Sequence, residues 1–285
     1  LVGTPGTTPS TYNVLTLAAM RMDNEAVPRN DRLCILSPKA HWSMADGELK
    51  TVFQQNIVDT LLRRGFIGNF ALMDFFMSQN IQSHTVGTWD AGSTGVMNGA
   101  TAEGATSLVT NGWAINTVIL QKGDVFTVAA VYGVNPVNGS VWEGNELRQF
   151  VATAQVTSDG AGAATIPIAP TIYSAAATED YLPYQTVVTL PQNGAAITVV
   201  GTDVASLPQN IAFIPDCFAL TMVPFEKPKS AGQSVMWGQA SDPDIGLSIT
   251  VATAFDITTY KEITRADILF GWDTPNPHFG VRITG

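Results

Sequence analysis

Charged residues are scarce in this sequence. Asp, Glu, Lys and Arg make up 13% of its 285 residues, about half of the roughly 25% that is usual in soluble globular domains. A subunit whose surface is covered by its neighbours needs less charge, because the cores of protein interfaces are depleted in charged residues. Secreted β-proteins are also poor in charge, so the composition is compatible with a subunit of an assembly and does not by itself establish one.

Basic clusters are also missing. The formal net charge is −10, and the chain has no run of Lys and Arg and no basic stripe interleaved with aromatic residues. Tight or sequence-specific binding to nucleic acid is therefore disfavoured. An acidic surface is compatible with non-specific proximity to DNA, because like charges keep the two from adhering.

Cysteines and long apolar segments are few. The two cysteines, Cys34 and Cys217, each lie in a short apolar run. This setting favours two buried free thiols over a disulfide, which indicates folding in a reducing cytoplasm. No apolar stretch approaches the roughly 20 residues needed to cross a bilayer, and no signal peptide is visible at the start. The sequence therefore predicts no membrane association.

Residues typical of catalytic and metal sites are scattered. The three histidines, His41, His84 and His278, lie far apart, and the chain has neither a Cys-x-x-Cys nor a His-Glu-x-x-His motif. A zinc site is therefore not expected, and motifs for a nucleophile elbow and a phosphate-binding loop are missing too. Only folding could bring distant groups such as His41, His84 and Asp74 together. We predict no catalytic residue, no cofactor and no metal site, and hence no enzyme.

The first third of the chain combines helix and strand patterns. Apolar residues at helical spacing predict a helix that ends at Pro28 and a second helix over residues 46–65. Short apolar runs predict a strand over residues 32–37 and one or two strands over residues 70–81.

The middle of the chain has a β pattern. From about His84 the composition shifts to Gly, Thr, Ser, Ala and Asn, and no helical period occurs between residues 123 and 202. Turn residues at 158–162 and 191–194 predict two β-hairpins, each joining the strand patterns on either side of the turn. Short strands with closely spaced turns are typical of a small barrel or sandwich.

Longer β segments follow Pro208, among them an alternating run over residues 247–257. A domain is normally grafted into a surface loop of another domain, with its two ends close together. We therefore expect residues 85–207 to form an inserted domain, and residues 1–84 and 208–285 to form one discontinuous domain around it.

Several short segments, spread over most of the chain in a fixed order, carry a family resemblance. They are residues 6–12, 24–29, 33–38, 65–68, 74–81, 122–129, 131–136, 147–151, 209–213, 254–257 and 265–271. As an ordered set they resemble the major capsid (coat) proteins of tailed bacteriophages, and in particular the short-tailed-phage branch with an inserted β-domain. One departure is Ile214-Pro215, which stands where that family usually has a more polar pair.

The resemblance implies an α+β chain with a Hong Kong-type phage capsid fold. Residues 1–84 and 208–285 would form its axial and peripheral parts, and residues 85–207 would form an inserted all-β barrel. In that family an N-terminal arm, an extended loop and a spine helix precede the segment at which this chain starts. Because the first residue is Leu1 and not Met, we expect the arm and the spine helix to be absent from this chain.

The function that the resemblance implies is structural. A major capsid protein folds in the host cytoplasm and self-assembles, as a many-copy homo-oligomer, into the icosahedral head that encloses the double-stranded DNA genome of the virion. Scaffolding, portal and decoration proteins are further partners that the resemblance suggests. Two alternatives stay open from the residues alone: a β-rich virion surface or receptor-binding module, and an unrecognised hydrolase.

One loop holds the residues that we expect at a contact between subunits. It joins two predicted strands and contains Asn135, Trp142, Glu143, Glu146 and Arg148. In this hypothesis Trp142 packs against a neighbour and the charges pair across the contact. The alternative is a solvated hairpin loop whose Trp142 folds back onto its own barrel. The sequence leaves both open, and it leaves open whether Trp272 belongs to a core or to an interface.

Overall fold

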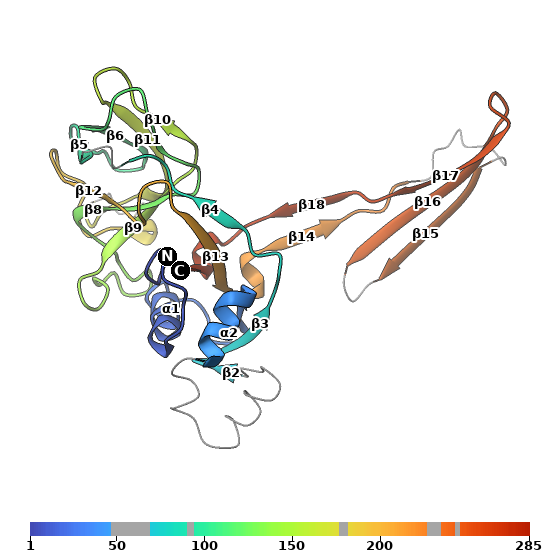
Figure 1. Ribbon diagram of the computed structural model, residues 1–285, viewed down its shortest axis with the longest axis horizontal. Coiled ribbons are helices and arrows are strands. Elements are labelled where there is room, and N and C mark those ends of the chain that lie inside the picture. The colour runs from blue at the N-terminus through green and yellow to red at the C-terminus, as the bar shows by residue number, and fades with distance from the viewer. Residues whose placement is uncertain (47–68, 90–93, 177–181, 227–234, 243–245) are drawn as a thin grey trace. The chain divides into compact units, whose positions relative to one another are not determined.

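The computed structural model describes residues 1–46, 69–89, 94–176, 182–226, 235–242 and 246–285. The chain divides into two compact units, which are residues 1–214 with 278–285, and residues 215–277. We call them unit 1 and unit 2. The described residues are mostly β with few helices (Figure 1), so the helical share is smaller than the predicted α+β chain suggests.

Unit 1 contains a sheet with the strand order β19-β13-β1-β3-β2. Its strands are β1 (Arg32–Leu36), β2 (Asn69–Phe70), β3 (Met73–Met77), β13 (Ser206–Phe213) and β19 (Gly280–Thr284), and β4 (Ser83–Thr85) pairs with β13. Strands β1 and β3 are parallel, and the other pairs are antiparallel. Side chains of this sheet form one hydrophobic core with helices α1 (Tyr12–Asn24) and α2 (Pro38–Asp46), and Leu15, Cys34 and Met44 are among its buried members.

The structure confirms part of the pattern predicted for this region. Strand β1 matches the predicted strand, and β2 and β3 are the two short strands expected after residue 69. Helix α1 ends at Asn24, before the predicted end at Pro28, because Ala26 adopts a positive φ of 56°. The predicted helix over residues 46–65 lies almost wholly outside the described residues.

Helix α2 was not predicted. It begins at Pro38, directly after the strand predicted over residues 32–37. The N–H of Ala40 donates to Ser37 Oγ at 3.3 Å, and the N–H of His41 donates to the Ser37 carbonyl at 2.9 Å. Serine before the helix and proline in its first turn are both favoured at this position, because proline has no N–H to leave unpaired.

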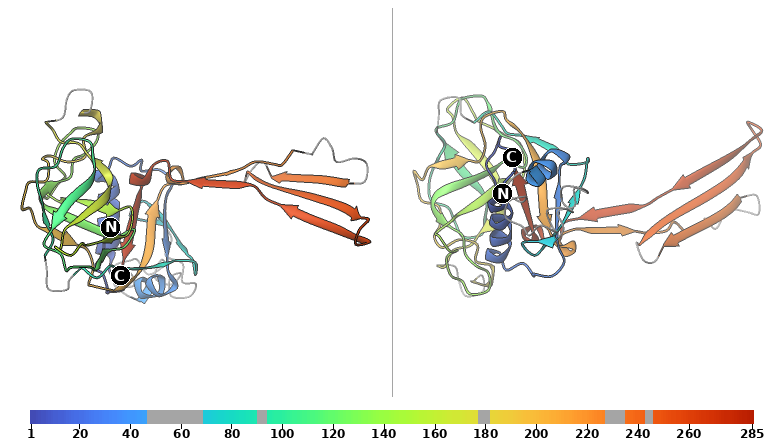
Figure 2. Two further views of the ribbon diagram at one scale, coloured as in Figure 1. Left: turned by 90° about the horizontal axis from the view of Figure 1, so that it is seen from above. Right: turned by 60° about the horizontal axis from the view of Figure 1, so that its bottom comes forward.

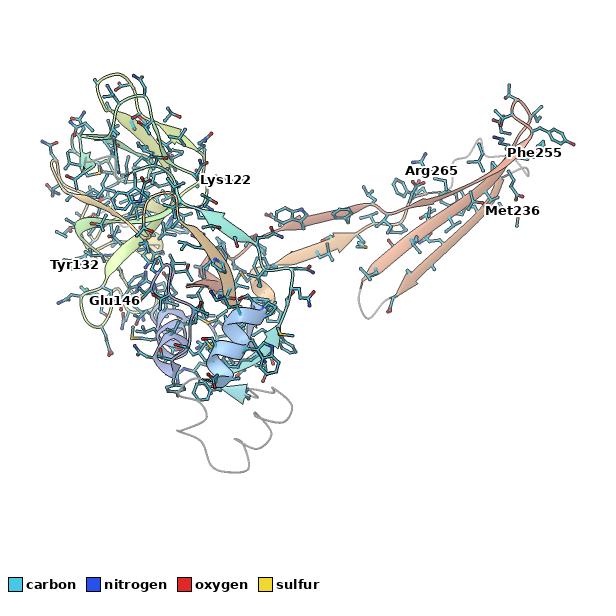
Figure 3. All side chains as sticks on the ribbon, viewed as in Figure 1. Lys122, Tyr132, Glu146, Met236, Phe255 and Arg265 are labelled. Carbon is cyan, nitrogen blue, oxygen red and sulfur yellow. The ribbon has the colours of Figure 1, made fainter. Side chains whose placement is uncertain are left out.

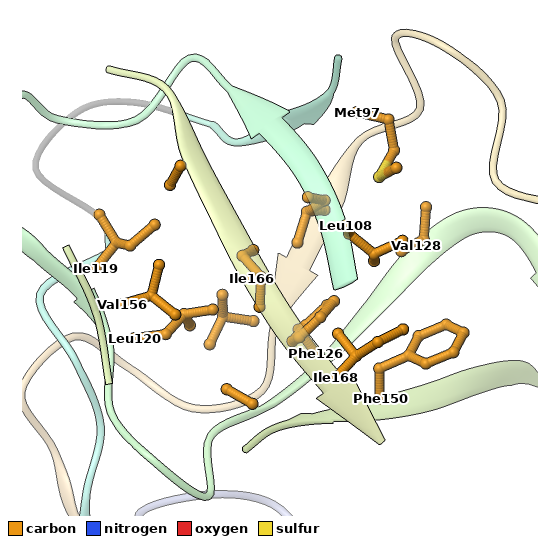
Figure 4. Close-up of a cluster of buried hydrophobic side chains, with 14 of the residues drawn as sticks. Met97, Leu108, Ile119, Leu120, Phe126, Val128, Phe150, Val156, Ile166 and Ile168 are labelled. Atoms are coloured by element: carbon orange, nitrogen blue, oxygen red, sulfur yellow. The ribbon is translucent and has the colours of Figure 1, made fainter. Parts of the chain in front are cut away.

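A second sheet of unit 1 has the order β12-β8-β9-β11-β6-β5. Its strands are β5 (Val96–Met97), β6 (Ala105–Asn111), β8 (Val125–Tyr132), β9 (Leu147–Ala152), β11 (Ala164–Ile172) and β12 (Ile197–Val199), and β7 (Val118–Leu120) pairs with β10 (Val156–Thr157) beside it. The N–H of Met97 donates to the Ala195 carbonyl and the N–H of Ile197 to the Gly95 carbonyl, both at 2.9 Å, which links the two outer strands. Figure 2 shows the strands of unit 1 from two further sides. The sheet encloses a second hydrophobic core, which includes Phe126 and Phe150 (Figure 4).

The first predicted hairpin is confirmed in part, and the second is wrong in its pairing. The turn at 158–162 forms, since Asp159 Oδ1 accepts the N–H groups of Ala161 and Ala163 at 2.8 Å. As predicted, β9 and β11 on either side of it pair antiparallel, although residues 156–157 form β10, which pairs with β7. Strand β12 pairs with β8, and not with residues 185–190. A turn sequence fixes a local chain reversal, but the core decides which strands become neighbours.

The two cores are separate in sequence. All buried members of the second core lie between Val86 and Leu207, and those of the first core lie outside that range. This division follows the predicted limits of the inserted domain, which stay a prediction. Three short 3-10 turns complete the described elements: η1 (Leu182–Tyr184), η2 (Pro215–Cys217) and η3 (Pro277–Phe279).

Unit 2 consists of a two-stranded ribbon and a three-stranded antiparallel sheet. The ribbon pairs β14 (Ala219–Met222) with β18 (Phe270–Asp273), and the sheet has the order β15 (Val235–Asp242), β16 (Leu247–Asp256) and β17 (Lys261–Asp267). The alternation predicted for residues 247–257 is present in β16, because Ser248 and Thr250 are buried while Leu247, Ile249 and Val251 are exposed.

The large side chains of unit 2 are mostly open to solvent. The alternating residues of β16 share one face with Phe255 and with Met236 of β15, which are 50% and 73% exposed (Figure 3). Among the described residues, unit 2 contributes no member to either hydrophobic core. Its sheet therefore carries an apolar face that its own described residues leave exposed.

Candidate functional site

The groups considered for catalysis do not form a shared site. His84 Nε2 lies 2.6 Å from Asp124 Oδ1, and Asp74 Oδ1 accepts a hydrogen bond from Asn69 at 2.8 Å. His41 is buried in α2, and His278 packs against Phe279. No group of three or more His, Cys, Asp or Glu residues that could hold a metal occurs within the described ranges.

The two thiols are buried and free of disulfides, as predicted. Burial raises the pKa of the Cys34 thiol to about 12, and it also raises the pKa of Cys217. A thiol that is protonated at neutral pH is a poor nucleophile, because the thiolate is the reactive form. Both cysteines therefore act as small apolar side chains.

The five residues predicted at a subunit contact lie in and beside the loop from β8 to β9. The outer part of this loop is a small hairpin closed by a bridge between Val134 and Val141. The N–H of Val137 donates to Asn135 Oδ1, and the N–H of Ser140 donates to Asn138 Oδ1, both at 2.9 Å. These turns fix the hairpin, and they leave Val137 80% exposed at its end.

Trp142 lies at the base of the loop and is only 2% exposed. The guanidinium carbon of Arg21 lies 4.0 Å from the centroid of its ring, and that of Arg148 lies 5.1 Å away. Contacts at these distances are cation–π interactions, which are strongest where water is excluded. A Cβ at Gly133 would lie 2.3 Å from the indole, so this position needs glycine for the ring to rest on the backbone.

Two ion pairs cross between the loop and α1. Arg21 Nη1 of α1 lies 2.8 Å from Glu146 Oε2, and Arg148 Nη1 of β9 lies 2.7 Å from Glu25 Oε1, just after α1. Burial lowers the pKa of Arg21, and the nearby charge of Arg148 lowers it further, whereas Glu25 and Glu146 raise it. The carboxylates of Glu25 and Glu146 pair with the guanidinium groups of Arg21 and Arg148 around the Trp142 ring.

We call these five residues the Trp142 cluster.

The structure thus separates the predicted contact residues into two sets. Trp142, Glu146 and Arg148 come together and attach the loop to α1 of the same chain, while Glu143 is exposed and Asn135 belongs to the outer hairpin. In the alternative hypothesis Trp142 folds back onto its own barrel; the ring does lie against Gly133, but it also contacts Arg21 of α1. The contact between subunits stays a prediction. Trp272 is 75% exposed in unit 2.

Sequence reasoning missed Arg21 and Glu25. Arg21 lies on the same side of α1 as the buried residues Leu15, Ala18 and Met22, and it is itself only 7% exposed. A charged residue within the apolar stripe of a helix is the signal that it has a partner, because unpaired buried charge is costly. The sequence could not tell which acid or ring that partner is.

A second polar contact joins the two cores of unit 1. Asp124 is 1% exposed, and its Oδ2 accepts the N–H groups of Gly87 at 3.0 Å and Gln121 at 2.7 Å, while Oδ1 faces His84. Arg282 of β19 donates to the Gly123 carbonyl at 2.9 Å. Burial lowers the pKa of Arg282, and Asp124 raises it. Together with the Trp142 cluster, this contact fixes how the two sheets of unit 1 meet.

Comparison with known families identifies the kind of protein to which this geometry belongs. A family model described as "P22 coat protein - gene protein 5" matches residues 2–285. The chain belongs to the P22 coat protein family. The coat protein is a structural major capsid protein of a tailed phage, it assembles with copies of itself into a capsid, and its place is the virion. The alternative of a virion surface or receptor-binding module is not favoured.

Two further comparisons add little to this assignment. A solved structure described as "CUS-3 coat protein I-domain" is similar over 38% of the coat protein and 94% of that chain, with 22% identity and a TM-score of 0.27, and a likeness at that score supports no argument. A search of the curated proteins found no match. No helix in the described ranges is long and apolar enough to cross a membrane.

Proposed function

We propose that the coat protein has a Hong Kong-type capsid fold, with residues 85–207 as an inserted β-barrel, and that it forms an icosahedral head around a double-stranded DNA genome. Membership of the coat protein family supports this proposal. The linked outer strands of the second sheet and its separate core are compatible with an inserted barrel. The net charge of −10 fits an inner surface that lies near DNA without adhering to it.

The observation that carries this proposal is the exposed apolar face of unit 2. Soluble monomers rarely leave large contiguous apolar patches open to water, and a sheet with one apolar face must bury that face against another layer. In unit 2 Leu247, Ile249 and Val251 point to the same exposed face. In the shell, other copies of the coat protein supply the cover.

The loop from β8 to β9 supplies a second contact in this proposal. Its outer hairpin presents Asn135, Val137 and Glu143 to a neighbouring subunit, while the Trp142 cluster holds its base. A loop that is rigid before it binds loses less entropy on binding, which favours affinity. The roles first assigned to Trp142 and Arg148 therefore change from direct contact to support of the contact.

Further partners and the lack of an enzymatic role belong to the same proposal. Scaffolding, portal and decoration proteins would bind the assembling shell, and folding would take place in the reducing host cytoplasm. The two unpaired thiols support that compartment. The scattered histidines and the protonated Cys34 thiol support a protein without catalytic activity.

Electron microscopy of the protein expressed from its complete reading frame tests this function. Closed particles with icosahedral symmetry are expected. A single small oligomer, such as a trimer by light scattering, would overturn the proposal.

The loop contact has its own test. The double variant Val137→Asp, Glu143→Lys changes only exposed side chains, so a normal circular dichroism spectrum and fewer particles are expected. Val204→Asp, at another exposed valine of unit 1 that is 57% exposed, is the matched control. A normal particle yield from the double variant would contradict the loop contact.

A further inference from the structure

The hairpin between β16 and β17 ends in an exposed apolar tip. Ile257 and Tyr260 are 85% and 84% exposed, and the Tyr260 ring packs edge-on against Phe255 with a centroid distance of 5.3 Å. Asp256 braces the turn, because its Oδ1 accepts the N–H and hydroxyl of Thr258 at 2.9 and 2.7 Å, and its Oδ2 accepts the hydroxyl of Thr259 at 2.6 Å. The tip therefore presents two large side chains on a turn that is already ordered.

The other end of the same sheet has an apolar hollow of about 380 Å³. Met222, Leu247, Ile249 and Ile268 contribute most of its large apolar side chains. Ser248 also lines it, and this serine is 8% exposed while its hydroxyl has no hydrogen-bond partner. A buried hydroxyl without a partner costs free energy, so a group that reaches Ser248 and forms a hydrogen bond with it removes that cost.

The tip cannot fill the hollow of its own chain. Ile249 and Ile257 lie eight positions apart (257 − 249) on one extended strand and its turn, which corresponds to roughly 26 Å at the usual rise per residue. A second copy of the chain brings a tip and a hollow of its own. Because the family assembles many copies of one chain, each hollow has a matching tip available.

We propose that the tip of one coat subunit, with Ile257 and Tyr260, enters the hollow of unit 2 in a second copy. The two apolar surfaces then bury one another. The Tyr260 hydroxyl brings a donor and acceptor toward the unpaired hydroxyl of Ser248, as a buried tyrosine requires. Tyrosine in a desolvated pocket is a frequent anchor of protein interfaces. The contact joins different parts of two identical chains, so it can propagate around a closed assembly.

This inference rests on the proposed function, since it needs a shell of many copies. Its first test is disulfide trapping in particles of the complete protein with Ile257→Cys and Ala240→Cys, the latter at a residue that lines the hollow. Oxidised particles are expected to give covalent dimers and higher oligomers on a denaturing gel, whereas the two single variants stay monomeric. A bond within one chain is excluded by the span, because disulfides need Cα atoms within about 7 Å.

The second test removes the tip. The double variant Ile257→Ala, Tyr260→Ala is expected to leave the circular dichroism spectrum unchanged and to raise the subunit concentration needed for assembly by about tenfold or more. Tyr260→Phe keeps the ring and is expected to lose less. Tyr184→Ala is the matched control, at a tyrosine of unit 1 that is 66% exposed, and it is expected to assemble like the wild type.

The outcomes separate the two proposals. Absence of particles from the wild-type protein would contradict the proposed function. If the wild type forms shells, but the cysteine pair stays monomeric and the double alanine variant assembles normally, the shell function stands and the tip contact is wrong. Covalent oligomers from the Ile257→Cys variant alone would also overturn it, because tips would then meet tips.

Discussion

Units 1 and 2 of the coat protein bury their apolar residues in opposite ways. Unit 1 has two internal cores, and large residues such as Phe126, Phe150 and Met22 are fully buried in them. Unit 2 has long, well-paired strands, yet Leu247, Ile249 and Val251 stay exposed. Strand pairing alone therefore does not indicate a stable domain. The apolar residues of unit 1 are covered by its own side chains, whereas those of unit 2 are left uncovered by its described residues.

The largest difference between the two units is expected when parts of each are expressed alone. Residues 85–207, which hold one complete core, are expected to give a soluble β-rich domain with a cooperative thermal transition. Residues 215–277 are expected to show no cooperative unfolding, because the apolar face of their sheet has no second layer to be buried against. Circular dichroism during heating measures both. A disordered product from residues 85–207 would refute the predicted boundary, and a cooperative transition from residues 215–277 would refute the contrast.

A matched pair of phenylalanines tests the same contrast in the whole subunit. Phe126 is 0% exposed and Phe255 is 50% exposed. Phe126→Ala is expected to lower the free energy of unfolding of the unassembled subunit by about 3–5 kcal/mol, because it leaves a cavity. Phe255→Ala is expected to change it by less than about 1 kcal/mol, as is usual for surface substitutions. Urea unfolding of both variants measures the difference, and equal losses would mean that unit 2 has a covered core after all.

A matched pair of arginines compares ion pairs in the two units. The Arg148–Glu25 pair in the Trp142 cluster has side chains 9% and 16% exposed, whereas Arg265 of the Arg265–Asp267 pair in unit 2 is 74% exposed. Arg148→Met is expected to cost about 1–3 kcal/mol, because it leaves Glu25 without its partner. Arg265→Met is expected to cost about 0–1 kcal/mol. Denaturant unfolding of both variants at low and high salt measures these losses. If salt changed the loss for Arg148→Met and not for Arg265→Met, the assignment of Arg148 to the buried pair and Arg265 to the exposed pair would be contradicted.

The smallest effect concerns the braced turn of the unit 2 tip. Hydrogen bonds from Thr259 and Thr258 lower the pKa of Asp256 to about 2. Because the pKa of Asp256 is lower in the folded state than in the unfolded state, these hydrogen bonds stabilise the turn at pH values above the unfolded-state pKa. This stabilisation is lost as the pH falls toward about 2. An NMR titration of the Asp256 carboxyl is expected to show this midpoint, and Thr259→Val is expected to raise it toward the ordinary value. An unchanged midpoint in the variant would show that the hydroxyl does not brace the turn.

Local patterns predicted much of the fold, and long-range packing decided the rest. The apolar stripe of α1 and the alternation of β16 are properties of neighbouring residues, so the sequence shows them directly. The pairing of β9 with β11 follows the turn pattern at 158–162, whereas the partner of β12 depends on which side chains fill one core, and the turn residues at 191–194 contain no information on that. The Ser37-Pro38 pair carries the local signal for the start of α2, which was not predicted.

The candidate site divides in the same way. The sequence identified the loop and three of the five residues of the Trp142 cluster, since Trp142, Glu146 and Arg148 stand out in a polar segment. It could not identify Arg21 and Glu25, because their contacts span more than 100 positions of the chain. It also could not show that the alternating residues of β16 would stay uncovered, because alternation predicts an apolar face and not what lies over it.

Side-chain footprinting before and after assembly tests directly whether other copies of the chain cover the apolar face of unit 2. Hydroxyl radicals oxidise exposed side chains, and in the free subunit Met236, Tyr260 and Tyr184 are all largely exposed. In assembled shells we expect Met236 and Tyr260 of unit 2 to become protected, while Tyr184 of unit 1 stays reactive. Equal reactivity of Met236 and Tyr260 in free and assembled protein would contradict the claim that unit 2 gains its apolar cover from other copies of the chain.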